Sequence, residues 1–185
     1  MARLVLLNGP PGVGKSTVAR RYLDDHPLAL LIEIDDLRVA MGGWADHEDS
    51  KRHARTLALA LARAHLGAGL DVVVPQYLGR PAYIDQLQAA ASEVEAAFAH
   101  VLLVDDRTAV GERFRGRRAD LLARGGAHPQ ADLADDEIDA AIADAERRLA
   151  DMVTDRPDIV VVRLSAGDPY QAVLASLRSI GGGCR

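Results

Sequence analysis

Cysteine, asparagine and lysine are all scarce in this 185-residue chain, and each scarcity excludes something. The one cysteine, Cys184, cannot form a disulfide within the chain, so we expect a reducing compartment, the cytoplasm. The one asparagine, Asn8, is not part of an Asn-Lys-x-Asp sequence, so the guanine-recognition motif of a regulatory GTPase is missing. The 22 basic residues include only two lysines, Lys15 and Lys51, and the first of these stands in a motif described below.

Long apolar runs and an excess of positive charge are also missing. No apolar stretch approaches the ~20 residues that span a bilayer, and the N-terminal residues lack the layout of a signal peptide. The net charge of −5 argues against a general nucleic-acid surface, because affinity for the phosphate backbone requires dense positive charge. We therefore expect neither a membrane nor a nucleic acid as a partner.

Short apolar runs alternate with helical patterns along the whole chain. The runs at 4–7, 28–34, 71–74, 100–105 and 159–162 have strand length, and helices are predicted at 16–23, about 50–65, 81–97, from 108, 138–153 and 168–177. This alternation predicts an α/β fold with a five-stranded parallel sheet covered by helices on both faces. We expect one domain over residues 1–180 and a flexible tail at 181–185.

The most specific pattern follows the first predicted strand, where Asn8-Gly9-Pro10-Pro11-Gly12-Val13-Gly14-Lys15-Ser16-Thr17 matches G-x-x-x-x-G-K-[ST]. Glycines let consecutive N–H groups turn inward, and the N-terminus of the next helix adds positive potential, which together bind phosphate. Lys15 is expected to reach the β- and γ-phosphates, and the Ser16 hydroxyl to bind Mg²⁺. The residues expected to bind nucleotide are Gly9, Pro10, Pro11, Gly12, Val13, Gly14, Lys15, Ser16 and Thr17.

Two aspartates follow the second predicted strand, and in a parallel sheet that end lies beside the phosphate loop. A carboxylate there can accept the proton of an attacking hydroxyl or hold a Mg²⁺-bound water. We assign Asp35 this catalytic and metal-binding role, and Asp36 a role in substrate binding or in capping the helix from Leu37. Arg38 either binds an anionic group of the substrate or lies on a solvated helix face.

An arginine cluster follows the fourth predicted strand. Arg113 and Arg117 are four residues apart and share a helix face, with Arg118 next to them. Phosphoryl transfer gains most from positive charge that closes on the migrating group and excludes water. We therefore predict an arginine-bearing lid over about residues 113–134, with Arg113 and Arg117 catalytic and Arg118 in contact with nucleotide; a solvated face is the alternative.

Polar and aromatic residues near the same rim are candidates for the substrate site. Trp44 is the only tryptophan and lies in a glycine-flanked polar stretch, where it either stacks on substrate or anchors the core. Gln76 and Tyr77 close the third predicted strand, and Tyr83 follows them. These three side chains either donate hydrogen bonds to a hydroxylated ligand or simply pack against the sheet.

With these motifs, the chain resembles the small-molecule kinases of the phosphate-loop class, in particular chloramphenicol phosphotransferases and tunicamycin-resistance proteins. Ile34-Asp35-Asp36-Leu37 is similar to the segment in which the phosphotransferases place their base, and Val74-Pro75 with Tyr83 is similar to the tunicamycin-resistance type. The acidic residues that the phosphotransferases carry after strand three are replaced here by Pro75-Gln76. The resemblance implies a P-loop NTPase three-layer sandwich with strand order 2-3-1-4-5.

The resemblance also implies a function. We expect transfer of the γ-phosphoryl group of ATP or GTP, with Mg²⁺, to a hydroxyl of a small molecule, by a monomer or homodimer. The expected acceptor is an antibiotic, either a nucleoside antibiotic or a chloramphenicol-like compound. A nucleoside-monophosphate kinase or a sugar or metabolite kinase is the nearest alternative, and a non-catalytic nucleotide-binding module is an alternative of another class.

Overall fold

A five-stranded parallel sheet lies at the centre of the computed structural model, which describes residues 1–123, 134–164 and 167–181. The strands are β1 (Arg3–Asn8), β2 (Leu30–Leu31), β3 (Val72–Pro75), β4 (Ala97–Val104) and β5 (Val160–Arg163). Every neighbouring pair is parallel and the spatial order is β2-β3-β1-β4-β5. The predicted sheet and its strand order are confirmed. Most of the predicted tail, residues 182–185, lies outside the described part of the chain.

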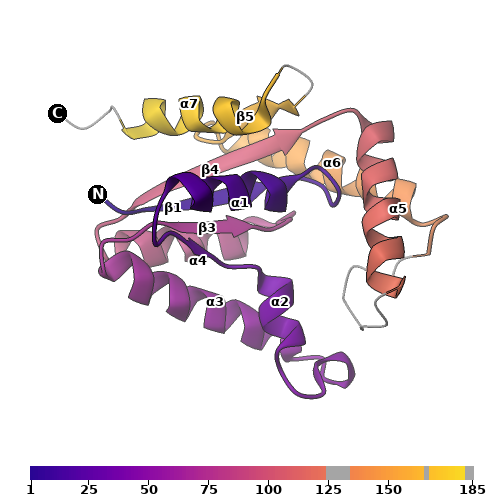
Figure 1. Ribbon diagram of the computed structural model, residues 1–185, viewed down its shortest axis with the longest axis horizontal. Helices are drawn as coiled ribbons and strands as arrows, with labels where there is room; N and C mark the ends of the chain where they lie inside the picture. The colour runs from indigo at the N-terminus through magenta and orange to yellow at the C-terminus, as the bar shows by residue number, and fades with distance from the viewer. Residues whose placement is uncertain (124–133, 165–166, 182–185) are drawn as a thin grey trace.

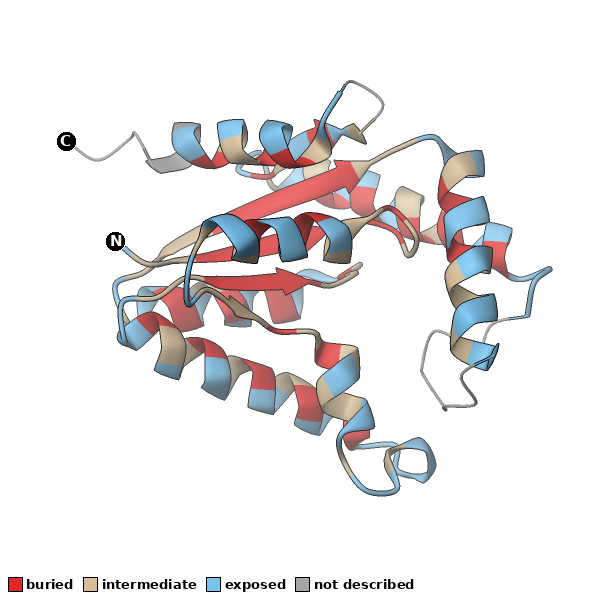
Figure 2. Ribbon diagram, viewed as in Figure 1, coloured by how far each residue is buried: buried red, intermediate tan, exposed pale blue. Residues whose placement is uncertain are grey.

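Helices cover both faces of this sheet, because successive strand residues point to opposite faces and both sets are apolar. Leu4 and Leu6 of β1 pack with α3 (Ser50–Gly67) and α4 (Pro81–Ser92) on one face. Val5 and Leu7 pack with α1 (Lys15–Asp25) and α7 (Pro169–Gly181) on the other. Each helix turns its buried residues towards the sheet (Figure 2), which gives the predicted three layers.

Three of the remaining helices lie near the carboxyl ends of the strands, where the strand arrows point in Figure 1: α2 (Ile34–Val39), the 3₁₀ helix η1 (Trp44–Asp46) and α5 (Arg107–Ala123). The last, α6 (Ile138–Asp155), runs behind β4, and its Leu149 and Met152 join the core on the α3 and α4 face. The Asp106 carboxylate accepts a hydrogen bond from the backbone N–H of Ala109 at 3.1 Å, which caps the start of α5. This edge therefore carries the phosphate loop together with α2 and α5.

The segment around β2 corrects one prediction. The predicted strand 28–34 is reduced to Leu30–Leu31, an edge strand that pairs only with β3, and α2 begins at Ile34. Asp35 and Asp36 therefore lie in the first turn of α2, and the N-cap is Glu33, so Asp36 does not cap a helix from Leu37. An apolar run does not by itself distinguish strand from helix, and the acidic residues favour a helix N-terminus.

The boundary between α4 and β4 corrects a second prediction. The helix predicted over 81–97 ends at Ser92, and β4 begins at Ala97, three residues before the predicted start at His100. Glu95 adopts a φ of 55° in the intervening turn, and Ala97 pairs with Arg3 of β1. Pairing with the central strand outweighs the helix preference of the alanines in this stretch.

Candidate active site

The glycine-rich motif forms the turn between β1 and α1, as predicted. Gly9 and Gly12 have φ angles of 145° and 84°, which L-residues with a side chain rarely adopt. A Cβ on Gly9 would stand 2.6 Å from the carbonyl oxygen of Leu103, and one on Gly12 would stand 2.5 Å from that of Val110. The loop thus lies directly against β4 and α5, and only glycine fits at these two positions.

Lys15 begins α1 and turns its ammonium back over this loop. Its Nζ donates to the carbonyl oxygens of Gly9 and Pro10, both at 2.9 Å. Burial, and next the positive charge of Arg117, lower the pKa of Lys15 to about 7, while Asp35 opposes the shift. The ammonium therefore sits where bound negative charge would stabilise its protonated form.

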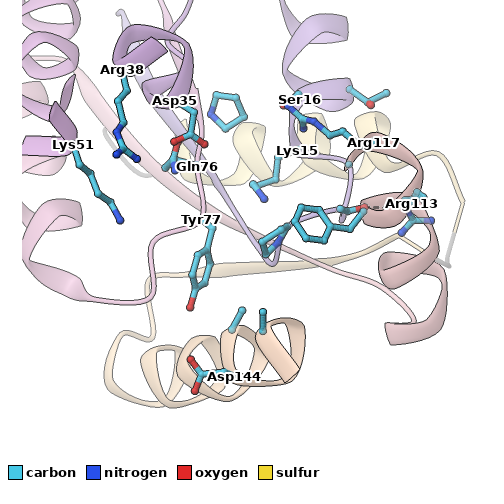
Figure 3. Close-up of a pocket in the computed structure, with 18 of the residues that line it drawn as sticks. Lys15, Ser16, Asp35, Arg38, Lys51, Gln76, Tyr77, Arg113, Arg117 and Asp144 are labelled. Carbon is cyan, nitrogen blue, oxygen red and sulfur yellow. Dashed lines mark hydrogen bonds between the residues drawn. The ribbon is translucent and has the colours of Figure 1, made fainter. Parts of the chain in front are cut away.

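A cavity of about 590 Å³ opens in front of the loop, and α2, α3, α5 and α6 form its walls. Figure 3 shows Lys15 and Ser16 on the loop side, Asp35 and Arg38 on the α2 side, and Arg113 and Arg117 on the α5 side. The predicted site residues that line it are Pro11, Gly12, Gly14, Lys15, Ser16, Thr17, Asp35, Arg38, Gln76, Tyr77, Arg113 and Arg117. The chain thus brings to one cavity residues as far apart in the sequence as Pro11 and Arg117.

The other predicted loop residues and one aspartate do not line this cavity. Gly9 and Pro10 form the base of the loop, and the Val13 side chain is fully buried in the core beneath it. Asp36 is the neighbour of Asp35 on α2, but only Asp35 lines the cavity. Consecutive helix residues point about 100° apart, so the two carboxylates cannot share one face.

Three further predicted residues, Trp44, Tyr83 and Arg118, do not themselves line this cavity. The Trp44 ring lies under the Arg38 guanidinium, 4.8 Å from the ring centroid. The Tyr83 hydroxyl donates to the carbonyl oxygen of Arg55 at 2.9 Å and lines an adjoining hollow. Arg118 pairs with Asp135 at 3.0 Å. Their roles in binding substrate or nucleotide remain predictions.

Helix α5 carries the two predicted catalytic arginines to the cavity. Arg113 donates from Nε to the carbonyl oxygen of Gly12 at 3.0 Å and from Nη2 to Asp105 at 2.6 Å. Arg117, one turn further along, lines the cavity close enough to lower the pKa of Lys15. Residues 124–133 of the predicted lid lie outside the described residues, so closure over the cavity remains a prediction.

Some cavity residues were missed by sequence reasoning. Lys51 and Arg55 come from α3, and Phe114 from α5. The spacing of Lys51 and Arg55, four residues apart at the start of a helix, is a signal that could have found them. Asp144 of α6 also lines the cavity, and no local pattern marks it; its hydrogen bonds to Arg148 and Arg147 lower its pKa.

The described side chains offer a metal ion few ligands. Within residues 1–123, 134–164 and 167–181, no group of three or more His, Cys, Asp or Glu side chains is placed to hold a metal ion. Mg²⁺ commonly uses only one or two protein oxygens together with substrate phosphates and water. The Ser16 hydroxyl and the Asp35 carboxylate, which line the same cavity, fit that requirement. No helix in the described part of the chain could cross a bilayer.

Solved structures of similar architecture include kinases and nucleotide-binding proteins. The tunicamycin resistance protein of Deinococcus radiodurans is 19% identical, with a TM-score of 0.58 over 98% of this chain and 96% of that one. A gluconokinase from Sinorhizobium meliloti 1021 is 21% identical, with a TM-score of 0.59 over 95% and 91%. Kti12 of Chaetomium thermophilum, solved with ADP-AlF3, is 16% identical, with a TM-score of 0.65 over 97% and 100%. These likenesses show the fold.

A search of curated proteins found no match. A family model, AAA_33, described as an AAA domain, matches residues 4–135, which is more than half of the chain. That span runs from β1 and the glycine-rich loop through Asp35 to the arginines of α5. The predicted resemblance to P-loop kinases is confirmed at the level of family and fold. The chain therefore belongs to the AAA_33 family of AAA domains, with the fold of a P-loop kinase.

Proposed function

We propose that this protein is a kinase that transfers the γ-phosphoryl group of ATP or GTP to a hydroxyl of a small molecule. One observation carries the proposal: Lys15, at the end of the glycine loop, and Asp35, on α2, line a single cavity together with Arg113 and Arg117. A nucleotide-binding module without chemistry would need only the loop. A carboxylate beside the phosphate site supplies the further group that an alcohol acceptor requires.

Each of these residues has a separate role in the proposed reaction. The loop amides and the Lys15 ammonium bind the β- and γ-phosphates, and Arg113 and Arg117 stabilise the charge on the equatorial oxygens of the moving group. Asp35 accepts the acceptor's hydroxyl proton as its oxygen attacks the γ-phosphorus. The bond from that phosphorus to the bridging oxygen breaks, and the diphosphate leaves with the electron pair. Mg²⁺, held by Ser16 and Asp35, would neutralise part of the phosphate charge.

Two of the similar solved structures support different classes of acceptor. The likeness to a tunicamycin resistance protein supports an antibiotic hydroxyl, of the nucleoside or chloramphenicol type, as the acceptor. The likeness to a gluconokinase supports a sugar or metabolite kinase instead. The positive charge on the cavity wall formed by α2 and α3 favours this second candidate, because an antibiotic without negative charge would leave it unbalanced.

The experiment that tests the kinase activity follows the label of [γ-³²P]ATP or GTP into hydroxyl compounds, with ADP or GDP release measured in parallel. We expect transfer that depends on both acceptor and enzyme, and none above background for Lys15→Ala, which should keep the wild-type circular dichroism. If ADP or GDP were released at the same rate with and without an acceptor, the protein would be a simple NTPase. Absence of nucleotide binding by folded protein would contradict the proposal altogether.

A further inference from the structure

A second group of cations lines the cavity on the wall away from the phosphate loop. Arg38 comes from α2, and Lys51 and Arg55 come from the first two turns of α3. In Figure 3, Arg38 and Lys51 point into the cavity from the side opposite Arg113, with Asp35 and Gln76 between them and Lys15. These three residues are therefore separate from the cations of the nucleotide site. We call Arg38, Lys51 and Arg55 the acceptor-side cations.

The acceptor-side cations differ from most arginines of this protein in their partners. In the described ranges, eleven arginines form ion pairs with carboxylates, as expected for a chain with a net charge of −5. Arg38 instead donates to the Ser50 hydroxyl at 2.9 Å, and the Arg55 guanidinium lies over the Tyr83 ring. None of the three forms an ion pair within those ranges. Within the described ranges, both arginines are positioned by neutral groups and not by carboxylates.

The surroundings of Lys51 contain more positive than negative groups among the described residues. Burial and then the Arg55 charge lower the pKa of Lys51, and Arg38 and Arg80 act in the same direction. Asp35 is the one acidic group that opposes this shift, and it does not outweigh them. An added anion would therefore relieve repulsion among fixed charges as well as form new hydrogen bonds.

The space beside these residues is large enough for a ligand group. A hollow of about 630 Å³ adjoins the main cavity and shares Lys51, Arg55 and Tyr77 with it. Arg80 adds further positive charge to its lining. Arg148 and Asp144 also line it, and these two side chains pair with each other at 2.6 Å. The positive charge of the hollow therefore comes from Lys51, Arg55 and Arg80.

We propose that the acceptor is an anionic alcohol, whose carboxylate or phosphate ester binds to Lys51, Arg55 and Arg38 while its hydroxyl lies at Asp35. This inference rests on the proposed kinase function and specifies its substrate class. The arrangement places the anion at one end of the cavity and the γ-phosphate at the other, with the carboxylate of Asp35 between them. Separate cationic sites for two anionic substrates keep them from competing for the phosphate loop.

The experiment measures binding of matched ligands to Mg·ADP-loaded protein and to Lys15→Ala, by calorimetry or NMR titration. Two sets of ligands each share one open-chain scaffold. The first is glycerol, glycerate and glycerol 3-phosphate, and the second is sorbitol, gluconate and sorbitol 6-phosphate. We expect at least one anionic member to bind about 10-fold or more tightly than its neutral counterpart. Comparison of the carboxylate and phosphate arms identifies which anion is preferred. The same preference is expected in Lys15→Ala, because the phosphate loop does not create it.

Matched variants locate the site. Lys51→Gln and Arg55→Gln should each reduce the preference at least about 3-fold, and the double variant should abolish it. Arg52→Gln removes the same charge from the same helix but from a residue paired with Asp49, so it should leave the preference unchanged. Equal binding of neutral and anionic members, no binding by any anionic member, or a preference that survives in the double variant would overturn the inference. Anion binding without label transfer would support this site and contradict the kinase activity instead.

Discussion

Lys15 and Asp35 face the same cavity with opposite charge, and their environments determine how each can act. The Lys15 ammonium is bound by two carbonyl oxygens but lies in a buried position near Arg117, so its protonated form is poorly stabilised without an anion. Asp35 lies in the first turn of α2 and faces the cavity across from Lys15. A triphosphate would supply the negative charge that Lys15 lacks.

Nucleotide binding should therefore take up a proton at alkaline pH. Burial and Arg117 lower the pKa of Lys15 to about 7 in the nucleotide-free protein, and bound phosphates should raise it again. At about pH 8.5 we expect uptake approaching one proton, and at pH 6 almost none, because Lys15 is already protonated there. Calorimetry in buffers of different ionisation enthalpy measures this. Equal uptake by Lys15→Ala would contradict the assignment.

The lowered pKa of Lys15 also makes the stability of the folded protein depend on pH. An unfolded lysine keeps its ordinary pKa of 10.5, so between pH 7 and 10.5 the unfolded chain binds more protons at this position. The contribution of Lys15 to the unfolding free energy of the nucleotide-free protein should therefore rise with pH through this window. Nucleotide should reduce that trend by restoring the ammonium.

Replacing Asp35 tests its role as the base. Asp35→Asn keeps the side-chain shape but cannot take the hydroxyl proton, so turnover should fall by ~10²-fold or more. Nucleotide affinity should change little if the loop and Lys15 dominate binding. Steady-state turnover and nucleotide titration measure the two effects separately. Asp36→Asn is the matched control, because Asp36 does not line the cavity. An equal loss of turnover in both variants would contradict the assignment of Asp35 as the base.

At the level of elements, α5 packs against the phosphate loop and carries Arg113 and Arg117. Arg113 is held by Gly12 and Asp105, while Gly12 approaches α5 so closely that no side chain fits between them. Arg117 stands one turn later on the same helix face. A shift of α5 would therefore move the loop and both arginines together. This coupling favours α5 as the fixed base of the predicted lid.

Arg117 should contribute to the transition state more than to nucleotide binding. Arg117→Gln removes a charge that faces the phosphate site, and we expect turnover to fall by about 10²-fold or more with a smaller change in nucleotide affinity. Arg115→Gln is the control on the same helix, since Arg115 pairs with Asp139 at 2.7 Å and does not line the cavity. Single-turnover kinetics separates chemistry from binding. Equal effects of the two substitutions would indicate a general electrostatic or folding effect.

In the whole molecule, Asn8 joins segments that are distant in the sequence at the carboxyl edge of the sheet. Its Oδ1 accepts from the N–H groups of Gly9 at 2.8 Å and Leu78 at 3.0 Å, and its Nδ2 donates to the carbonyl oxygen of Leu78 at 3.0 Å. Nδ2 also lies 3.2 Å from Nε2 of His100, whose pKa is lowered to about 4 by burial, so the ring is neutral. This fully buried amide fixes the phosphate loop relative to the loop after β3.

Removing this amide should destabilise the whole fold. Asn8→Ala leaves two buried N–H groups without an acceptor, which costs roughly 2–3 kcal/mol of unfolding free energy. For a chain of this size that corresponds to a melting temperature lower by about 4–10 °C. Chemical and thermal denaturation measure both quantities. Ser92→Ala, on an exposed face of α4, should change stability by less than about 0.5 kcal/mol, and a similar small change in Asn8→Ala would contradict the structural role.

The sequence by itself determined the phosphate loop, the alternation of strands and helices and, through resemblance, the strand order. These features are encoded locally, because glycine spacing and apolar runs act over a few residues. It also predicted Asp35, Gln76 and Tyr77 at one rim, since the carboxyl ends of parallel strands meet at one edge. That rule requires only the order of the elements along the chain.

Tertiary structure alone decided which residues face the cavity. Asp35 lines it and Asp36 does not, because α2 begins earlier than the apolar pattern predicted and turns the two side chains apart. Lys51, Arg55 and Asp144 reach the same space from helices whose local sequence does not reveal their neighbours. The positive charge of the acceptor side arises from the packing of α2 against α3, which depends on contacts between segments and not on a motif in either one.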